Sequence, residues 1–297
     1  MTDPTPKIWE AVNAWRKEAR GRILAARTAL PPTLRQGMTA ALMERLHPLL
    51  QEADGPISFY WPFRGEPDLR PLMRALAAEG IEIALPVAKK IGEPLTFRPW
   101  QPGCAMARGI WDIPIPATDL EILPQTIIAP LVGFDAALYR LGYGGGFFDR
   151  TLAQRKKPAE VIGVGFAMFQ LPSIRPQPHD VPMGRIVTER SAALVTTAGG
   201  SSPVCYAEES EPRYAGELDM HELVSALQPL RAIVPVERIP LLEFIYWRLG
   251  RDDGNGEVQV GAKAPADLDL YLARLIPRMQ DDGIHAALQA LRATLIP

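Results

Sequence analysis

Apolar positions in the first fifty residues recur at the spacing of amphipathic helices. Over residues 8–29, apolar side chains return every three or four positions, and basic residues fill the opposite face. Residues 33–51, which follow two consecutive prolines, carry a second apolar stripe made mostly of leucines. Two helices are therefore predicted before the first strand.

From residue 57 onward, short apolar runs rich in β-branched and aromatic residues alternate with helical patterns. The runs that predict strands are 57–61, 82–87, 95–100, 126–132 and 161–167, and the patterns that predict helices are 69–79 and 147–154. Strands that alternate with helices at this interval form mainly parallel sheets. The predicted fold is α/β, a three-layer, mainly parallel sheet with helices on both faces.

A change in composition near residue 198 predicts a domain boundary. The stretch 198–203 is rich in Gly and Ser and is typical of a linker. We therefore predict a first domain over residues 1–197 and a smaller, mostly helical C-terminal domain over 198–297. Its expected helices are 220–230, 239–249, 266–279 and 284–295. Its Cys, Glu and His residues have no metal-binding spacing, and its role is left open between homo-oligomerisation and docking of a partner.

Composition excludes several classes of protein. The 297 residues are 47% hydrophobic and 22% charged with a net charge of −2, so no basic nucleic-acid-binding surface is expected. No apolar run approaches the roughly 18 residues of a membrane span, and the N-terminus lacks the hydrophobic region of a signal peptide. The two cysteines are far apart, which argues against a disulfide framework. We expect a cytoplasmic protein that binds neither nucleic acid nor membrane.

The stretch from Arg140 to Arg150 is the strongest candidate for chemistry. It places four glycines within five positions, between an arginine and an Asp-Arg pair. A predicted strand precedes it and a predicted helix follows, an order that presents backbone N–H groups and a helix N-terminus to a phosphate. The spacing matches neither the Rossmann fingerprint nor a Walker A loop. On glycine content alone, a hairpin without a ligand explains it as well.

Other candidate residues have simple explanations when each is taken alone. The basic residues of the first helix form a face that is usually only solvated. Glu66 lies in the loop after the first predicted strand, where an acid is normally exposed. His179-Asp180 is too short a motif to assign a role. Trp100 and Trp111 either pack in the core or form aromatic walls of a binding site.

Taken together, these stretches resemble one family. Arg140 to Asp149 follows the signature of the 5-formyltetrahydrofolate cyclo-ligase family, also called methenyltetrahydrofolate synthetase, which is Arg-Leu-Gly-x-Gly-x-Gly-Tyr-Tyr-Asp. Phe147-Phe148 stands here where that family usually has Tyr-Tyr. Arg16 and Arg20 match its Lys-x-x-x-Arg pattern with Arg in place of the commoner Lys. Glu66-Pro67-Asp68 and His179-Asp180 also match, so the resemblance spans about residues 16–195.

The resemblance implies an enzyme that uses ATP and Mg²⁺ to close 5-formyltetrahydrofolate to 5,10-methenyltetrahydrofolate, with ADP and phosphate as the other products. The residues then expected at ATP are Arg16, Lys17, Arg20, Arg140, Leu141, Gly142, Tyr143, Gly144, Gly145, Gly146, Phe147 and Phe148. Those expected at the folate are Trp61, Glu66, Tyr143, Gly144, Gly145, Gly146 and Phe147. Arg140 and Glu66 are the predicted catalytic residues, and Asp149 and Asp180 the predicted metal ligands.

Two alternatives stay open at this point. One is a non-catalytic or regulatory relative that binds ATP and a folate while its C-terminal domain docks a partner. The replacement of the usual lysine by Arg16 favours it mildly, because Arg and Lys hold phosphate differently. The other is a different phosphate-binding enzyme on a similar scaffold, such as a sugar-phosphate isomerase or a CoA transferase.

Overall fold

The computed structural model describes residues 6–190 and 192–194, and in the C-terminal part residues 227, 230, 234–248, 272–273, 275–278 and 282–295. Contacts divide the chain into two compact units. The first comprises Met1–Arg20 and Arg35–Thr197, and the second comprises Gly21–Leu34 and Ala198–Pro297. The predicted two-domain division at residue 197 stays a prediction.

A mixed sheet forms the centre of the first unit. Among the described residues it has seven strands in the order β11-β10-β9-β6-β1-β2-β3. Their bounds are β1 Ile57–Ser58, β2 Ile83–Val87, β3 Thr96–Trp100, β6 Thr126–Pro130, β9 Glu160–Val164, β10 Arg185–Val187 and β11 Ala192–Leu194. The five strands from β10 to β2 are parallel, and the edge strands β11 and β3 run antiparallel to their neighbours. The predicted mainly parallel sheet is confirmed.

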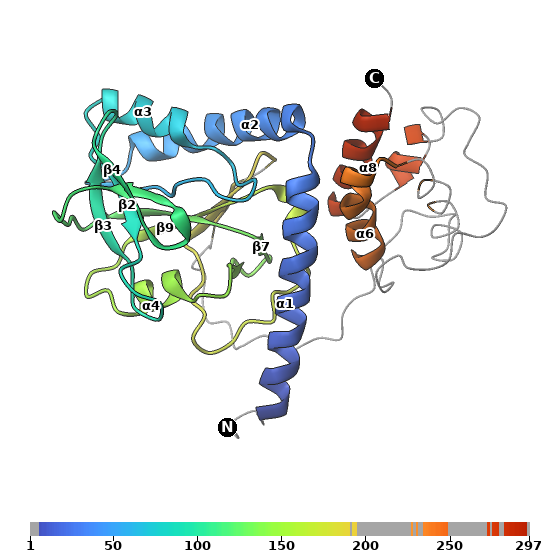
Figure 1. Ribbon diagram of the computed structural model, residues 1–297, viewed down its shortest axis with the longest axis horizontal. Helices are drawn as coiled ribbons and strands as arrows, with labels where there is room; N and C mark the ends of the chain where they lie inside the picture. Colours follow the sequence, from blue (N-terminus) through green and yellow to red (C-terminus); the bar gives the residue numbers. More distant parts are fainter. Residues whose placement is uncertain are drawn as a thin grey trace. The chain divides into compact units, whose positions relative to one another are not determined.

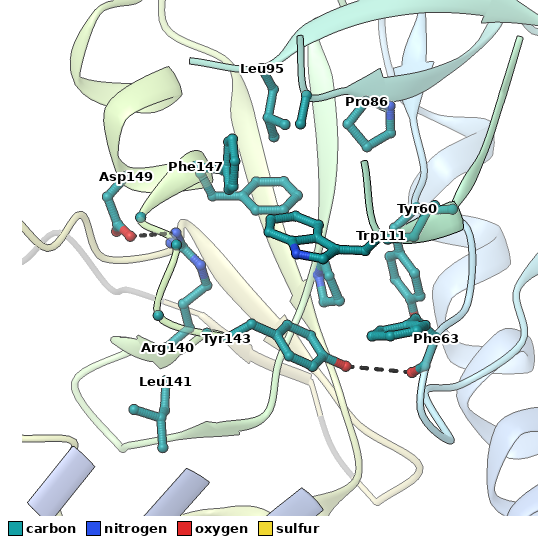
Figure 2. Close-up of a pocket in the computed structure, with 18 of the residues that line it drawn as sticks. Tyr60, Phe63, Pro86, Leu95, Trp111, Arg140, Leu141, Tyr143, Phe147 and Asp149 are labelled. Carbon is teal, nitrogen blue, oxygen red and sulfur yellow. Dashed lines mark hydrogen bonds and ion pairs between the residues drawn. The ribbon is translucent and has the colours of Figure 1, made fainter. Parts of the chain in front are cut away.

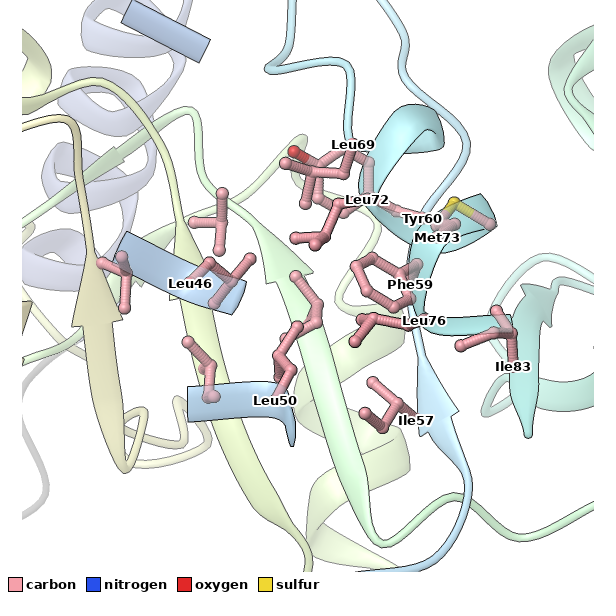
Figure 3. Packing of buried hydrophobic residues seen from close by; sticks show 14 of the residues in the cluster. Leu46, Leu50, Ile57, Phe59, Tyr60, Leu69, Leu72, Met73, Leu76 and Ile83 are labelled. Carbon is pink, nitrogen blue, oxygen red and sulfur yellow. The ribbon is translucent and has the colours of Figure 1, made fainter. Parts of the chain in front are cut away.

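Helices cover both faces of this sheet (Figure 1). On one face lie α2 (Pro32–Gln51) and α3 (Arg70–Ala78), whose buried leucines pack with Ile57 and Phe59 of the β1 segment (Figure 3). On the other lies α4 (Phe147–Ala153), which packs against Ala84, Phe97 and Ile127. Neighbouring residues of one strand point to opposite faces of the sheet. A strand that is apolar on both faces is therefore buried only if helices cover both faces of the sheet. The predicted three-layer arrangement is confirmed.

Two short hairpins were not predicted from the sequence. β4 (Met106–Arg108) pairs with β5 (Pro114–Pro116), and β7 (Gly133–Phe134) pairs with β8 (Arg140–Leu141). Strands of two or three residues leave little alternation to recognise. The first and last predicted strands of the sheet are also shorter than expected, because β1 stops at Ser58 and β9 at Val164.

The second unit contains the end of helix α1 (Pro6–Ala29) together with α6 (Ile239–Arg248) and α8 (Asp282–Leu295). The helices α6 and α8 pack against each other and bury most of their apolar side chains. Arg238, in the 3₁₀ turn Val236–Arg238, donates a hydrogen bond to the Ala29 carbonyl, and Arg22 lies 3.8 Å from Glu243. The helices predicted at 239–249 and 284–295 are confirmed. Those predicted at 220–230 and 266–279 fall largely outside the described residues.

No helix in the described part of the chain is long and apolar enough to cross a membrane. The cytoplasmic location stays a prediction, and so does homo-oligomerisation through residues 198–297.

Candidate functional site

A cavity of about 580 Å³ lies at the carboxyl ends of the parallel strands in the first unit. Parallel α/β sheets bind their ligands at this edge. Its walls come from α1, the loop after β1, the β4–β5 hairpin, the glycine-rich loop after β8 and the segment 177–180. Every residue that the sequence analysis placed in the site lines this cavity except Lys17, which is exposed on α1.

The glycine-rich loop folds tightly against α1. Gly144 and Gly146 have φ angles of +92° and +63°, a conformation that glycine adopts at little cost. The Arg20 Nε donates a 2.7 Å hydrogen bond to the Gly142 carbonyl. A Cβ built on Gly144 would lie 3.3 Å from the Arg20 guanidinium carbon, so a glycine there leaves room for the cation.

Glu66 connects the loop after β1 to the glycine-rich loop. The Phe63 N–H donates to its Oε2 at 2.8 Å, and the Tyr143 hydroxyl donates to its Oε1 at 2.8 Å. Glu66 is only 6% exposed, unlike an ordinary loop acid. A buried carboxylate with defined partners is held in one orientation at the cavity wall.

Arg140 and Asp149 form a buried ion pair at the other end of the same loop. The Arg140 Nη2 lies 2.8 Å from Asp149 Oδ2, and the Val181 N–H donates to Asp149 Oδ1 at 3.2 Å. A dashed line marks the ion pair in Figure 2. Burial lowers the pKa of Arg140, and the charge of Asp149 opposes this effect only in part. An arginine stays protonated all the same, so this buried cation gains from a further anion.

Arg16 and Asp180 form a second pair, 2.5 Å apart. The Gln177 N–H also donates to Asp180 Oδ2, at 2.6 Å. Arg20 lies close enough to Arg16 that the like charge, added to the larger effect of burial, lowers the pKa of Arg20. Two neighbouring cations beside a glycine-rich loop favour a multiply charged anion between them.

Aromatic side chains also line the cavity. Trp111 is 56% exposed, and its ring meets the Phe147 ring edge to face with the ring centroids 5.5 Å apart. Figure 2 shows these two rings side by side. The Arg70 guanidinium carbon lies over the Trp61 ring, 5.3 Å from the ring centroid. Arg70 donates two short hydrogen bonds to the Asp68 carboxylate, which hold it there. Trp100 packs in the core instead. Of the two tryptophans, Trp111 therefore lines the cavity and Trp100 belongs to the core.

Comparison with known proteins agrees with this arrangement. The family model of the 5-formyltetrahydrofolate cyclo-ligase family matches residues 12–189, which hold every predicted site residue. The chain belongs to the 5-formyltetrahydrofolate cyclo-ligase family. The resemblance inferred from the glycine-rich loop is thus confirmed, and with it the prediction that the chain is an enzyme of the ligase class.

Three similar proteins each cover part of this chain and nearly all of their own length. A 5-formyltetrahydrofolate cyclo-ligase of Mycolicibacterium smegmatis is 31% identical over 183 residues, 59% of this chain and 94% of the relative. One of Escherichia coli K12 is 33% identical over 172 residues, 54% of this chain and 93% of the relative. The structure of 5,10-methenyltetrahydrofolate synthetase from Aquifex aeolicus, at 24% identity, shows the same fold with a TM-score of 0.54, over 66% of this chain and 99% of that one.

A magnesium ion needs oxygen ligands, and the two predicted metal ligands of this chain are of that type. Asp149 and Asp180 line the same cavity, but each is already paired with an arginine. Among the described residues no group of three His, Cys, Asp or Glu side chains gathers around a metal position. This donor set suits an ion that takes its remaining ligands from nucleotide phosphate and water, as Mg²⁺ often does.

Several residues that line the cavity were not predicted from the sequence. Asn13 lies one turn before Arg16 on α1 and accepts a 3.0 Å hydrogen bond from Gln177. Its i, i+3 spacing to Arg16 was a signal that could have found it. Phe63 lies 6.1 Å from the Tyr143 ring, from a loop 80 residues earlier in the chain. No local pattern links these two rings.

Proposed function

We propose that this family member closes 5-formyltetrahydrofolate to 5,10-methenyltetrahydrofolate at the expense of ATP, releasing ADP and phosphate. The observation that carries the proposal is one cavity that joins a cationic end to a carboxylate end. Arg16, Arg20 and Arg140 with the glycine-rich loop form the first, and Glu66 with its aromatic neighbours forms the second. A phosphate donor and a neutral heterocycle can therefore meet at the loop between them.

The cationic end is suited to the triphosphate. Arginines present planar forks of N–H donors that match phosphate oxygens. The pKa of both Arg20 and Arg140 is lowered mainly by burial. Phosphate oxygens would restore the solvation that burial removes from these cations. In the proposed role, backbone N–H groups of the loop and the three arginines hold the phosphates.

The carboxylate end is suited to the pterin ring. A reduced pterin carries an amino group beside a ring N–H, and a carboxylate accepts two such donors side by side. Glu66 is held at the cavity wall by Phe63 and Tyr143. Trp61, stacked under Arg70, supplies a flat apolar surface beside it. Together they would place the formyl group toward the glycine-rich loop.

The reaction needs an activated formyl oxygen. That oxygen attacks the γ-phosphorus of ATP, the bond to the bridging oxygen breaks, and ADP leaves. The N10 nitrogen then attacks the formyl carbon, the carbon–oxygen bond breaks, and phosphate departs with the former formyl oxygen while N10 loses its proton. Catalysis of this kind depends mostly on positioning and on neutralising phosphate charge. In the proposed role, Arg140 and its neighbours would serve both purposes.

Magnesium bound with the nucleotide would neutralise further phosphate charge. Asp149 and Asp180 are the residues that would hold it. In the absence of the ion, the two carboxylates orient Arg140 and Arg16, so their replacement affects the arginines as well. Titration of activity with Mg²⁺ in Asp149→Asn and Asp180→Asn separates these roles, because a lost metal ligand raises the Mg²⁺ concentration needed for half-maximal rate.

Isotope tracing tests the proposed chemistry most directly. With ¹⁸O in the formyl group, the proposal requires one ¹⁸O in each phosphate released and one ADP for each methenyl product. Unlabelled phosphate would refute phosphorylation of the formyl oxygen even if the product forms. ATP binding without any product would favour a regulatory relative instead.

A further inference from the structure

Asp135 is a buried carboxylate outside the cavity to which the proposed chemistry gives no role. It is 3% exposed and follows β7 directly, at the start of the loop that leads to Arg140. Burial raises its pKa, although its hydrogen bonds and the nearby Arg16 oppose that shift. Carboxylates are rarely buried to this extent unless they are well bonded.

One oxygen of Asp135 fixes the hairpin loop before Arg140. Its Oδ1 accepts the N–H groups of Ala137 and Tyr139, both at 3.1 Å. The same loop contains Leu138 at a φ of +64°, which is unusual for a branched side chain. The carboxylate therefore stabilises a strained turn, and the conformation of that turn determines the position of Arg140 at the start of β8.

The other oxygen of Asp135 reaches a segment far along the chain. Its Oδ2 accepts the Ile174 N–H at 3.0 Å. The carbonyls of Ile174 and Arg175 in turn accept Arg16 Nε at 3.0 Å and Arg16 Nη2 at 2.8 Å. Arg16, so oriented, makes its ion pair with Asp180. A single carboxylate thus connects the turn before Arg140 to the backbone that seats Arg16.

We propose that Asp135 is a positioning residue that fixes Arg16 and Arg140 relative to each other, so that both cations face one phosphate chain. This inference rests on the proposed function for its link to ATP, but the orientation of Arg16 can be measured without any nucleotide. Asp135 does not line the cavity, so it acts only through the segments that it holds.

The test compares Asp135→Asn with Glu189→Gln. Glu189 is a matched control. Burial raises its pKa as well, and its carboxylate accepts a backbone N–H, that of Ala167, at 2.9 Å. It does not contact the arginines described above, and like Asp135 it does not line the cavity. The first readout is NMR hydrogen exchange of the Arg16 Nε–H without nucleotide. We expect its protection to fall at least about tenfold in Asp135→Asn and to stay unchanged in Glu189→Gln.

The second readout is the KM for ATP. We expect the KM for ATP to rise about tenfold in Asp135→Asn. In the double variant that combines Asp135→Asn with Arg16→Lys, the KM should rise by clearly less than the product of the two single rises, because the two residues are coupled. Unchanged Nε–H protection in Asp135→Asn would overturn the inference. Lost protection with an unchanged KM would leave the positioning role standing and refute the phosphate role of Arg16.

A second variant guards against misfolding. Asp135→Ser keeps one oxygen that can accept an N–H within the loop, but it cannot bond the loop and Ile174 at once. Arg16 should therefore lose its protection in a folded Asp135→Ser protein. Retained protection there would also contradict the positioning role.

Discussion

Replacing Gly144 by alanine is the perturbation that separates a structural role of the glycine-rich loop from a binding role. Gly144 has a φ of +92°, and a Cβ there would lie 3.3 Å from both the carbon and a nitrogen of the Arg20 guanidinium. Gly80, outside the cavity, has nearly the same φ of +90°, but a Cβ there would meet no atom within 4 Å. The two glycines therefore form a matched pair.

The backbone cost should be the same at both positions. A left-handed conformation costs an L-residue roughly 1–2 kcal/mol, so each variant should lower the free energy of unfolding by about that amount. Only at Gly144 must Arg20 also move, by a few tenths of an ångström, and strain its 2.7 Å hydrogen bond to the Gly142 carbonyl. We expect this to weaken ATP binding about tenfold, which corresponds to about 1.4 kcal/mol.

Two measurements on each variant check this reasoning. Urea unfolding gives the change in stability, and isothermal titration calorimetry gives the Kd for ATP. Both variants should lose similar stability, while only Gly144→Ala loses affinity for ATP. Equal ATP affinity in the two variants would refute the placement of Arg20 at the nucleotide, and normal stability of Gly80→Ala would refute the estimate of the strain.

Three further predictions concern other parts of the chain. Asp149→Asn should lower kcat at least about a hundredfold and lower the unfolding temperature, because it leaves the Arg140 charge unpaired in a buried position; near-normal kcat would contradict its role. Glu66→Gln should raise the KM for the folate more than that for ATP, since only the pterin is expected to face this carboxylate; equal rises would mean that it acts through the fold. Removal of residues 198–297 should lower the unfolding temperature by taking away the Arg238 bond to the Ala29 carbonyl; an unchanged temperature would show that this contact adds no stability.

The layers of the fold could be predicted from the sequence because their signals are local. The leucine stripe of α2 and the apolar run at β6 each specify an element within a short window. β1 shows the limit of that information. Its apolar run continues to Trp61, but the strand ends at Ser58, and the Tyr60 hydroxyl donates to the Pro67 carbonyl across the following loop.

The pairing of charges could not be predicted in the same way. Arg16 and Asp180 are 164 positions apart, and no periodicity connects them. Asp135 was missed because an aspartate after a short apolar stretch is typical of an ordinary turn residue. Its distinguishing contact, with the Ile174 N–H, depends on how two distant loops meet. The family resemblance supplied the candidate residues, and the structure supplied their partners.

The measurement that tests the central claim is the absorbance of the methenyl-folate product when the 297-residue protein is mixed with 5-formyltetrahydrofolate, ATP and Mg²⁺. We predict a rise in absorbance that disappears when either ATP or the folate is left out and that is lost in Arg140→Gln. A rise without ATP, or an undiminished rise in Arg140→Gln, would contradict an ATP-dependent cyclisation at the glycine-rich loop.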